Sequence, residues 1–235
     1  MELKIMKILA IETAGRVCGV SLLEDDNLIK EAMIEDENTH SVKLMPLIDN
    51  VLKETNTAVQ DIDLFACDKG PGSFTGIRIG ISTIKAFADA TNKKVIGITS
   101  LENLACYEQG DQPVATMLDA KNGNVYYGVF QRTPTGSYEE VIPSQFSTVR
   151  EALTKIEALG QSITFVGDGC MVYQEDIQDV LGKKATFKKE HKLHPTHIGM
   201  LAYIKRNEAT DTNHLVPTYL RKSNAERMLE ENNKE

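Results

Sequence analysis

Acidic side chains stand at the ends of three apolar runs, where they could hold a metal ion or a nucleotide. Glu12 ends the run "KILAIE", Asp119 ends "VATMLD" and Asp168 lies in "VGDG". Carboxylates and glycines that meet at the carboxyl ends of strands can bind a metal–nucleotide complex. Aspartate and glycine also end strands for purely structural reasons, so each position alone favours the structural interpretation. Only their combination in one duplicated fold keeps a nucleotide site among the candidates.

The glycine-rich stretch "DKGPGSFTGIRIG" invites comparison with three catalytic or phosphate-binding motifs, and it fits none of them. A phosphate loop has the pattern G-x-x-x-x-G-K-[ST], but Gly70 and Gly76 are one residue too far apart and Ile77 follows them. The dinucleotide fingerprint fails because its third glycine is replaced by Thr75. A nucleophile elbow centred on Ser73 fails because glycine is missing on both sides. The stretch is therefore not predicted to do chemistry.

A structural interpretation of the same stretch has a clear physical basis. Gly-Pro-Gly permits a sharp corner between a strand and a helix, and Ser73 or Thr75 can cap that helix. Gly76 and Gly80 leave a shallow face on which another helix could approach closely. The neighbouring apolar stripe could face the chain's own sheet, or it could form a partner surface.

Histidines and cysteines show no pattern typical of a metal site. A metal pair on one helical face would place a second histidine four residues after His40, but that position is Leu44. His194 and His197 have a spacing that a metal could use, yet they stand at the start of an expected helix with no cysteine near them in sequence. Four cysteines are scattered without any C-x-x-C pair, which argues against a zinc site and against a disulfide framework. We predict no metal.

The composition is that of a soluble protein from a reducing compartment, and we expect it in the cytoplasm. The chain has 235 residues, is 41% hydrophobic and carries a formal net charge of −8. An acidic chain is a poor ligand for nucleic acid, because phosphate contacts dominate such affinity. No run approaches the roughly 18 apolar residues of a membrane helix, and the short apolar N-terminus resembles a strand more than a signal peptide.

The order of expected elements indicates an α/β fold built from a repeated unit. The N-terminal half reads as three strands followed by alternating helices and strands, and after a turn-rich break at 110–113 a similar order begins again. Two long helices are expected at about 41–55 and 75–90. We expect an N-terminal lobe at 1–108, a C-terminal lobe at 109–212, and a final segment at 213–235 that can return to the N-terminal lobe and frays at its end.

Several stretches together resemble the bacterial TsaB family, also called YeaZ. They are "KILAIETA", "HSVKLMPLIDNVL", "KGPGSFTGIRIG", "LDAKNGNVYYGVF", "VGDG" and "PTYLR", and the glycine-rich one is the most specific. The resemblance spans nearly the whole chain. It implies a duplicated, ribonuclease-H-like fold of two lobes, as in the actin/hexokinase/heat-shock ATPase superfamily.

The resemblance also implies a pseudo-enzyme with no catalytic residues of its own. Such a subunit pairs with the catalytic sibling TsaD and works with the ATPase TsaE to make threonylcarbamoyladenosine beside the tRNA anticodon. It would touch tRNA only indirectly, form a homodimer when alone, and associate with no membrane. The two long helices would provide the partner interface, with these residues: Leu44, Leu47, Ile48, Val51, Thr75, Gly76, Ile77, Gly80, Ile84 and Phe87.

Two departures from the family pattern weaken nucleotide binding. The usual D-T-S of the first turn is Glu12-Thr13-Ala14 here, and the usual D-A-R is Asp119-Ala120-Lys121. We therefore expect no tightly bound cofactor, with ATP or ADP at the interface of the complex as an alternative. A vestigial nucleotide site would comprise Glu12, Thr13, Asp119, Lys121, Gly167, Asp168 and Gly169. The main rival hypothesis is a true small-molecule kinase or ATPase that uses the three acids with Mg-nucleotide, and a third is a metallopeptidase.

Overall fold

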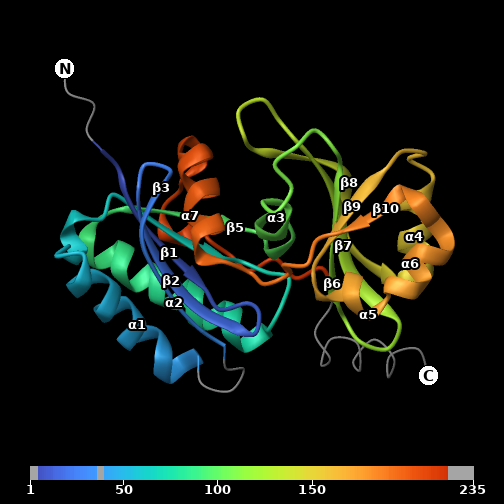
Figure 1. Ribbon diagram of the computed structural model, residues 1–235. Coiled ribbons are helices and arrows are strands. Elements are labelled where there is room, and N and C mark those ends of the chain that lie inside the picture. Colours follow the sequence, from blue (N-terminus) through green and yellow to red (C-terminus); the bar gives the residue numbers. More distant parts are fainter. Residues whose placement is uncertain (1–4, 36–39, 222–235) are drawn as a thin grey trace.

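The computed structural model describes residues 5–35 and 40–221, which form two lobes that lie side by side (Figure 1). Each lobe is built on one five-stranded mixed sheet. Within the described ranges, no helix combines the length and the apolar character that crossing a membrane requires.

The first sheet has the spatial order β3-β2-β1-β4-β5. Its strands are β1 (Lys7–Glu12), β2 (Val17–Glu24), β3 (Asn27–Glu35), β4 (Leu64–Asp68) and β5 (Lys94–Ile98). The first three strands form an antiparallel meander, whereas β4 and β5 run parallel to β1. The continuous apolar runs of β1 and β4 are buried on both faces, as central strands covered by helices require.

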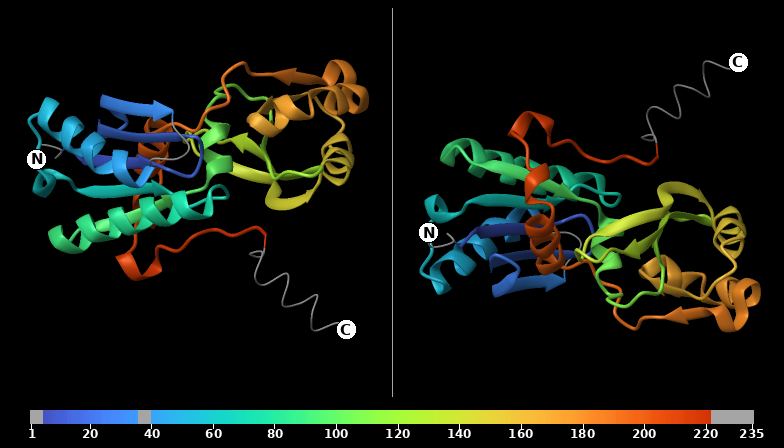
Figure 2. Two further views of the ribbon diagram at one scale, coloured as in Figure 1. Left: turned by 90° about the horizontal axis from the view of Figure 1, so that it is seen from below. Right: turned by 90° about the horizontal axis from the view of Figure 1, so that it is seen from above.

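Helices cover both faces of the first sheet. Helices α1 (His40–Glu54) and α2 (Phe74–Thr91) pack on one face, and α7 (Pro195–Ile204) packs across the sheet from them, on β1 and β2 (Figures 1 and 2). Helix α1 continues past Pro46 without a break. The apolar stripes of α1 and α2 face the sheet, so their outer faces are exposed.

The second sheet repeats the topology of the first. Its strands are β6 (Val114–Asp119), β7 (Asn124–Arg132), β8 (Tyr138–Thr148), β9 (Ile163–Val166) and β10 (Ala185–Phe187). Their spatial order, β8-β7-β6-β9-β10, matches β3-β2-β1-β4-β5 strand for strand. The repeated unit expected from the sequence is thus present in the pairing of both sheets.

Shorter helices complete the second lobe and the junction. In the second lobe these are α4 (Val149–Glu157), α5 (Asp168–Val172), α6 (Gln174–Leu181) and the 3₁₀ turn η2 (Gly182–Lys184). In the first lobe, the 3₁₀ turns η1 (Val59–Asp61) and η4 (Thr212–His214) contact α2, and η3 (Arg206–Glu208) follows α7. Helix α3 (Ser100–Ala105) lies between the lobes, where it contacts β6, β7 and α7 (Figure 1).

The position of α7 differs from the expectation. The expected C-terminal lobe at 109–212 includes this helix, yet it packs on the first sheet. Gly199 allows the close approach, because a Cβ there would lie 2.2 Å from Leu23 Cδ1. Ile198, Leu201 and Ala202 are buried in the same contact. An apolar helix must be buried somewhere, but its sequence does not say against which sheet.

The segment 215–221, here termed the C-terminal strap, connects the two lobes. Leu215 is buried and Thr218 N donates to Lys69 O at 2.7 Å, both in the first lobe. At the other end of the strap, the Arg221 guanidinium lies 4.8 Å from the centre of the Phe146 ring in the second lobe. The remainder of the expected final segment, 222–235, lies outside the described residues.

The interlobe cleft and the outer faces of two helices

The ends of β1 and β6 face a cleft between the lobes. Two adjoining cavities, of about 460 Å³ and about 270 Å³, occupy this cleft. Residues shared by their linings are Gly15, Arg16, Leu118, Asp119, Lys121, Asp168 and Leu193. Three of the seven residues proposed for a vestigial nucleotide site are therefore on the cleft wall, namely Asp119, Lys121 and Asp168.

Glu12 lies beneath the cleft and is paired with a second carboxyl group. The parallel pairing of β1 and β4 brings Glu12 next to Asp68, and both are fully buried. Asp68 Oδ1 accepts hydrogen bonds from Gly70 N at 2.7 Å and from Ser100 Oγ at 2.6 Å, and among the described residues its Oδ2 has no hydrogen-bond partner. Burial raises the pKa of Glu12 well above its usual range, and the charge of Asp68 raises it further. Burial also raises the pKa of Asp68, to about 6.

The second oxygen of Glu12 occupies the loop that follows β1. Glu12 Oε1 accepts hydrogen bonds from Ala14 N at 2.7 Å and from Gly15 N at 3.1 Å. Backbone N–H groups in such a turn are the ones that a bound phosphate would use. Because the chain's own carboxyl group takes them, this loop has no donors left at these two positions for a phosphate.

Asp119 is likewise paired within the chain. Its carboxylate accepts from Lys121 N at 2.9 Å, from Lys121 Nζ at 2.8 Å and from Tyr173 OH at 3.3 Å. Partial burial would raise the pKa of Asp119, but the hydrogen bonds from Lys121 outweigh burial and lower it. Asp168 Oδ1 accepts from Asp119 N at 3.0 Å. Lys121 thus supplies the positive charge that a divalent cation would otherwise bring to Asp119.

The other members of the expected nucleotide site serve packing. Thr13 is buried, and its hydroxyl donates to Gly76 O at 2.8 Å. A Cβ on Gly167 would lie 2.1 Å from Met117 O, and one on Gly169 would lie 2.9 Å from Leu118 C. These glycines therefore allow α5 to approach β6 closely.

The histidine pair at the start of α7 is also structural. His197 Nδ1 lies 3.1 Å from Asn103 O, and burial lowers the pKa of His197 to about 4. His194 Nδ1 lies 3.5 Å from Glu31 Oε1, which also accepts from Thr196 N. Among the described residues, no group of three or more His, Cys, Asp or Glu side chains could hold a metal ion.

The glycine-rich corner is structural, as predicted, but it packs against a different neighbour. Ser73 caps α2 by accepting from Gly76 N at 3.2 Å, and Gly70 has a φ of +97°. A Cβ on Gly76 would lie 1.9 Å from Thr13 O, and one on Gly80 would lie 2.5 Å from Thr13 Oγ1. The close approach is therefore made by the loop after β1, and the expected approach of another helix is wrong.

Most of the residues proposed for the partner interface belong to the chain's own core. Eight of the ten are buried, namely Leu44, Leu47, Ile48, Val51, Gly76, Ile77, Gly80 and Ile84. Phe87 is partly buried and stacks on Phe65, with ring centres 6.0 Å apart, and only Thr75 is exposed. These eight residues lie on the sides of α1 and α2 that face the sheet, so a partner could contact them only if the helices moved away from the sheet. The predicted interface on this face of the helices is therefore corrected.

The outer faces of the same helices carry exposed apolar side chains instead. On α1, Val42 is 68% exposed and Met45 is 51% exposed. On α2, Phe74 is 46% exposed and stacks against Tyr219 of the strap, with ring centres 5.2 Å apart. Arg78 lies 3.9 Å above the Phe74 ring, and its Nε donates to Tyr219 OH at 3.0 Å.

The sequence did not predict the cluster of Phe74, Arg78 and Tyr219, and the reason can be identified. Tyr219 is 141 residues from Arg78, so no local pattern connects them. The exposed apolar residues of α1 could have been predicted, because Val42 and Met45 lie away from the buried stripe of that helix. A shallow groove of about 440 Å³ continues along α2 from Phe74 to Thr83.

Comparisons with known proteins give a consistent result. A family model described as "TsaD: tRNA N6-adenosine threonylcarbamoyltransferase" matches residues 33–229. The "tRNA threonylcarbamoyladenosine biosynthesis protein TsaB" of Bacillus subtilis is 34% identical over 224 residues, which cover 94% of this chain and 96% of the relative. A solved structure titled "YeaZ from Pseudomonas aeruginosa" is 25% identical, covers 92% of this chain and 100% of that one, and has a TM-score of 0.76.

A more distant likeness concerns the fold alone. The ROK hexokinase of Thermus thermophilus has 10% identity and a TM-score of 0.53, and it covers 86% of this chain and all of its own. Together with the matching strand order of both sheets, it confirms the α/β fold of two lobes built from a duplicated unit.

Proposed function

The chain belongs to the TsaB (YeaZ) family and has a role in threonylcarbamoyladenosine biosynthesis, and on that premise we propose that it is a non-catalytic subunit that activates TsaD. TsaD would transfer the threonylcarbamoyl group to the adenosine beside the anticodon. This chain would contribute a docking surface and a stable two-lobed body.

The observation that carries the proposal is the state of the cleft acids. Glu12 is buried beside Asp68 and accepts from the N–H groups of Ala14 and Gly15, and Asp119 is paired with Lys121. A kinase or ATPase needs free carboxylates for Mg²⁺ and free loop N–H groups for the phosphates. Glu12 and Asp119 already accept hydrogen bonds from other groups of the chain. This supports the proposal that the subunit does not catalyse phosphoryl transfer.

The proposed docking surface is the outer face of α1 and α2. Val42 and Met45 on α1 and Phe74 on α2 expose apolar surface, and the guanidinium of Arg78 lies over the Phe74 ring. Exposed aromatic, methionine and arginine side chains are typical of protein interfaces. The same surface would support a homodimer when TsaD is absent.

Proposals for tRNA, TsaE and nucleotide follow from the net charge of the chain and from its proposed pairing with TsaD. With a net charge of −8, the chain would meet tRNA only through the complex. TsaE would join the pair. We also propose that the isolated chain binds no cofactor tightly, and that ATP or ADP binds, if at all, at the interface of the complex.

Reconstitution tests this function. The purified chain is expected neither to hydrolyse ATP nor to modify tRNA, whereas adding it to TsaD and TsaE with the threonylcarbamoyl donor is expected to yield modified tRNA. The rival hypothesis of a small-molecule kinase or ATPase predicts micromolar binding of Mg-ATP by the chain alone, which calorimetric titration measures.

A further inference from the structure

The chain crosses between the two lobes at a junction built around α3. Residues 106–113 lead from α3 to β6, and residues 188–194 lead from β10 back to α7. Two lobes joined in this way are expected to move relative to each other unless their interface is large and apolar. Where a hinge operates, a few residues at the crossings take up the rotation. The contacts made by these two crossings therefore decide whether the junction bends.

Asn103 on α3 binds the returning crossing through both polar atoms of its amide. The residue is fully buried, its Oδ1 accepts from His194 N at 3.2 Å and its Nδ2 donates to His194 O at 3.1 Å. The Nδ2 also donates to Glu12 Oε2 at 3.4 Å, and His197 Nδ1 lies 3.2 Å from Oδ1. An asparagine amide has two hydrogens to donate and two lone pairs that accept, so all four are used. The end of the crossing, where α7 begins, is thus fastened to α3.

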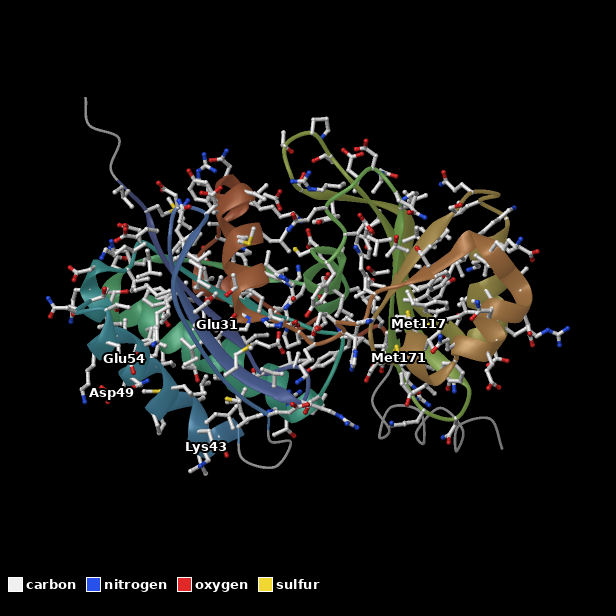
Figure 3. All side chains as sticks on the ribbon, in the orientation of Figure 1. Glu31, Lys43, Asp49, Glu54, Met117 and Met171 are labelled. Carbon is white, nitrogen blue, oxygen red and sulfur yellow. The ribbon has the colours of Figure 1, made fainter. Side chains whose placement is uncertain are left out.

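His197 completes this arrangement as a hydrogen-bond donor. Its Nδ1 faces two oxygens of Asn103, the backbone O at 3.1 Å and Oδ1 at 3.2 Å, so Nδ1 carries the hydrogen. Burial lowers the pKa of His197 to about 4, and the ring is therefore uncharged at neutral pH. Glu31 on β3 anchors the same turn, because its Oε1 accepts from Thr196 N at 3.2 Å. Figure 3 shows Glu31 on the first lobe, on the side where α7 begins.

The two crossings are also joined to each other. Tyr107, just after α3, donates from its hydroxyl to Lys192 O at 2.8 Å. The rings of Tyr107 and His197 meet edge to face, with centres 4.9 Å apart and an angle of 87° between their planes. Lys188 Nζ lies 3.2 Å from Glu108 Oε2. A rotation of the lobes that separated the crossings would break these contacts together.

An apolar contact accompanies these hydrogen bonds. All six residues of α3 are buried, as is typical of a helix that has protein on every side. Val114, Phe130 and Val166 of the second sheet belong to one continuous buried core with Leu104 of α3 and the first sheet. Figure 1 shows α3 between the two sheets. The junction is therefore a packed and hydrogen-bonded interface between the lobes.

We propose that this junction is a locked hinge, in which Asn103 and Tyr107 fasten the two crossings so that the lobes keep one relative orientation. The interlobe cleft then neither opens nor closes, and the second lobe holds a fixed position relative to the docking surface on α1 and α2. The proposal concerns the isolated chain, so failure of the proposed pairing with TsaD would leave it unaffected.

Residual dipolar couplings of backbone N–H groups test whether the lobes move as one body. The ¹⁵N-labelled full chain is weakly aligned, and the couplings from the strands of each sheet are fitted separately. One alignment tensor is expected to describe both sheets of the unchanged chain. Asn103→Ala is expected to abolish this common alignment, so that the two sheets require different tensors. Because Asn103→Ala leaves buried groups unpaired and destabilises the chain, Tyr107→Ala provides a second variant with the same expected loss.

Tyr173→Ala is the matched control. Tyr173 is partly buried and donates from its hydroxyl to Asp119 Oδ1 at 3.3 Å, but both residues lie within the second lobe. This variant is expected to retain the common tensor. The proposal is overturned if the two sheets of the unchanged chain require different tensors, or if Tyr173→Ala loses the common tensor as well. It is also overturned if Asn103→Ala keeps the common tensor, or if Tyr107→Ala keeps it where Asn103→Ala does not fold.

Discussion

The buried pair of Glu12 and Asp68 is the residue-scale feature that most separates this chain from a nucleotide-using enzyme. A glutamate carboxyl group reaches one methylene further than an aspartate at the same position. Here that reach lets Glu12 Oε1 turn back onto the N–H groups of Ala14 and Gly15. Glu12 is therefore bound internally, by the chain's own loop.

The raised pKa values of Glu12 and Asp68 make stability depend on pH. Both carboxyl groups have pKa values raised in the folded state, so the folded chain binds more protons than the unfolded chain above the ordinary carboxyl range. The contribution of this pair to the free energy of unfolding is therefore expected to fall as the pH rises from about 5 to about 8, by on the order of 1 kcal/mol or more. His197, whose pKa is lowered to about 4, contributes in the opposite direction over the lower part of this range, so the share of the pair is the difference between the unchanged chain and Glu12→Gln. Urea unfolding at a series of pH values measures this slope.

Glu12→Gln is expected to flatten that slope and to stabilise the chain at neutral pH by about 1 kcal/mol. The amide can donate to Asp68 and still accept from the two loop N–H groups, without any proton to lose. Glu139→Gln, on the exposed side of β8, serves as the control and should keep the original slope. An unchanged slope in Glu12→Gln would show that the buried pair does not govern the pH dependence.

At the scale of elements, the position of α2 depends on its contact with the loop after β1. A Cβ at Gly76 would meet the backbone oxygen of Thr13 at 1.9 Å, and backbone cannot move aside as a flexible side chain can. Gly76→Ala is expected to lower the free energy of unfolding by roughly 3 kcal/mol or more, which denaturant titration measures. Ser82→Ala, on the exposed face of the same helix, should stay within about 0.5 kcal/mol. Equal stability of the two variants would contradict the packing described.

A glutamate introduced on the exposed face of α1 should weaken partner binding, whereas one introduced on the buried face should unfold the chain. Met45→Glu leaves the core intact, so we expect normal thermal unfolding but loss of TsaD binding by at least roughly tenfold. Leu47→Glu places a charge in the core and is expected to unfold the chain. Size-exclusion chromatography of the chain mixed with TsaD, alongside thermal unfolding, distinguishes the two. Full complex formation by Met45→Glu would remove the outer face of α1 from the interface.

At the scale of the whole molecule, the C-terminal strap contacts both lobes. It joins Lys69 in the first lobe to Phe146 in the second through Thr218 N and Arg221. Arg221→Ala is expected to speed hydrogen exchange at Thr218 N a few-fold, because a cation over an aromatic ring contributes about 0.5–1 kcal/mol. Arg206→Ala removes a similar contact, 4.4 Å from the Tyr203 ring, and should leave that exchange rate unchanged. Identical exchange in Arg221→Ala and the unchanged chain would mean that the strap is held by its other contacts.

Sequence periodicity predicted the strands, the long helices and their repetition, because local hydrophobic pattern determines which segments form which element. It could not predict what an apolar face packs against. The stripe of Leu44, Leu47 and Ile48 could have faced a partner as well as the chain's own sheet, and the apolar α7 could have belonged to either lobe. The Phe74–Arg78–Tyr219 cluster depends on residues far apart in the chain. The pairing of Glu12 with Asp68 depends on strand register, which no single stretch of sequence encodes.

The central claim is that this chain supports tRNA modification through its docking surface and not through chemistry in its cleft. The most direct measurement is the threonylcarbamoyladenosine formed by TsaD and TsaE with the unchanged chain, with Asp119→Asn or with Met45→Glu. We predict that Asp119→Asn sustains product formation at the level of the unchanged chain and that Met45→Glu reduces it at least tenfold. Full product with Met45→Glu, or loss of product with an Asp119→Asn variant that still binds TsaD, would contradict the claim.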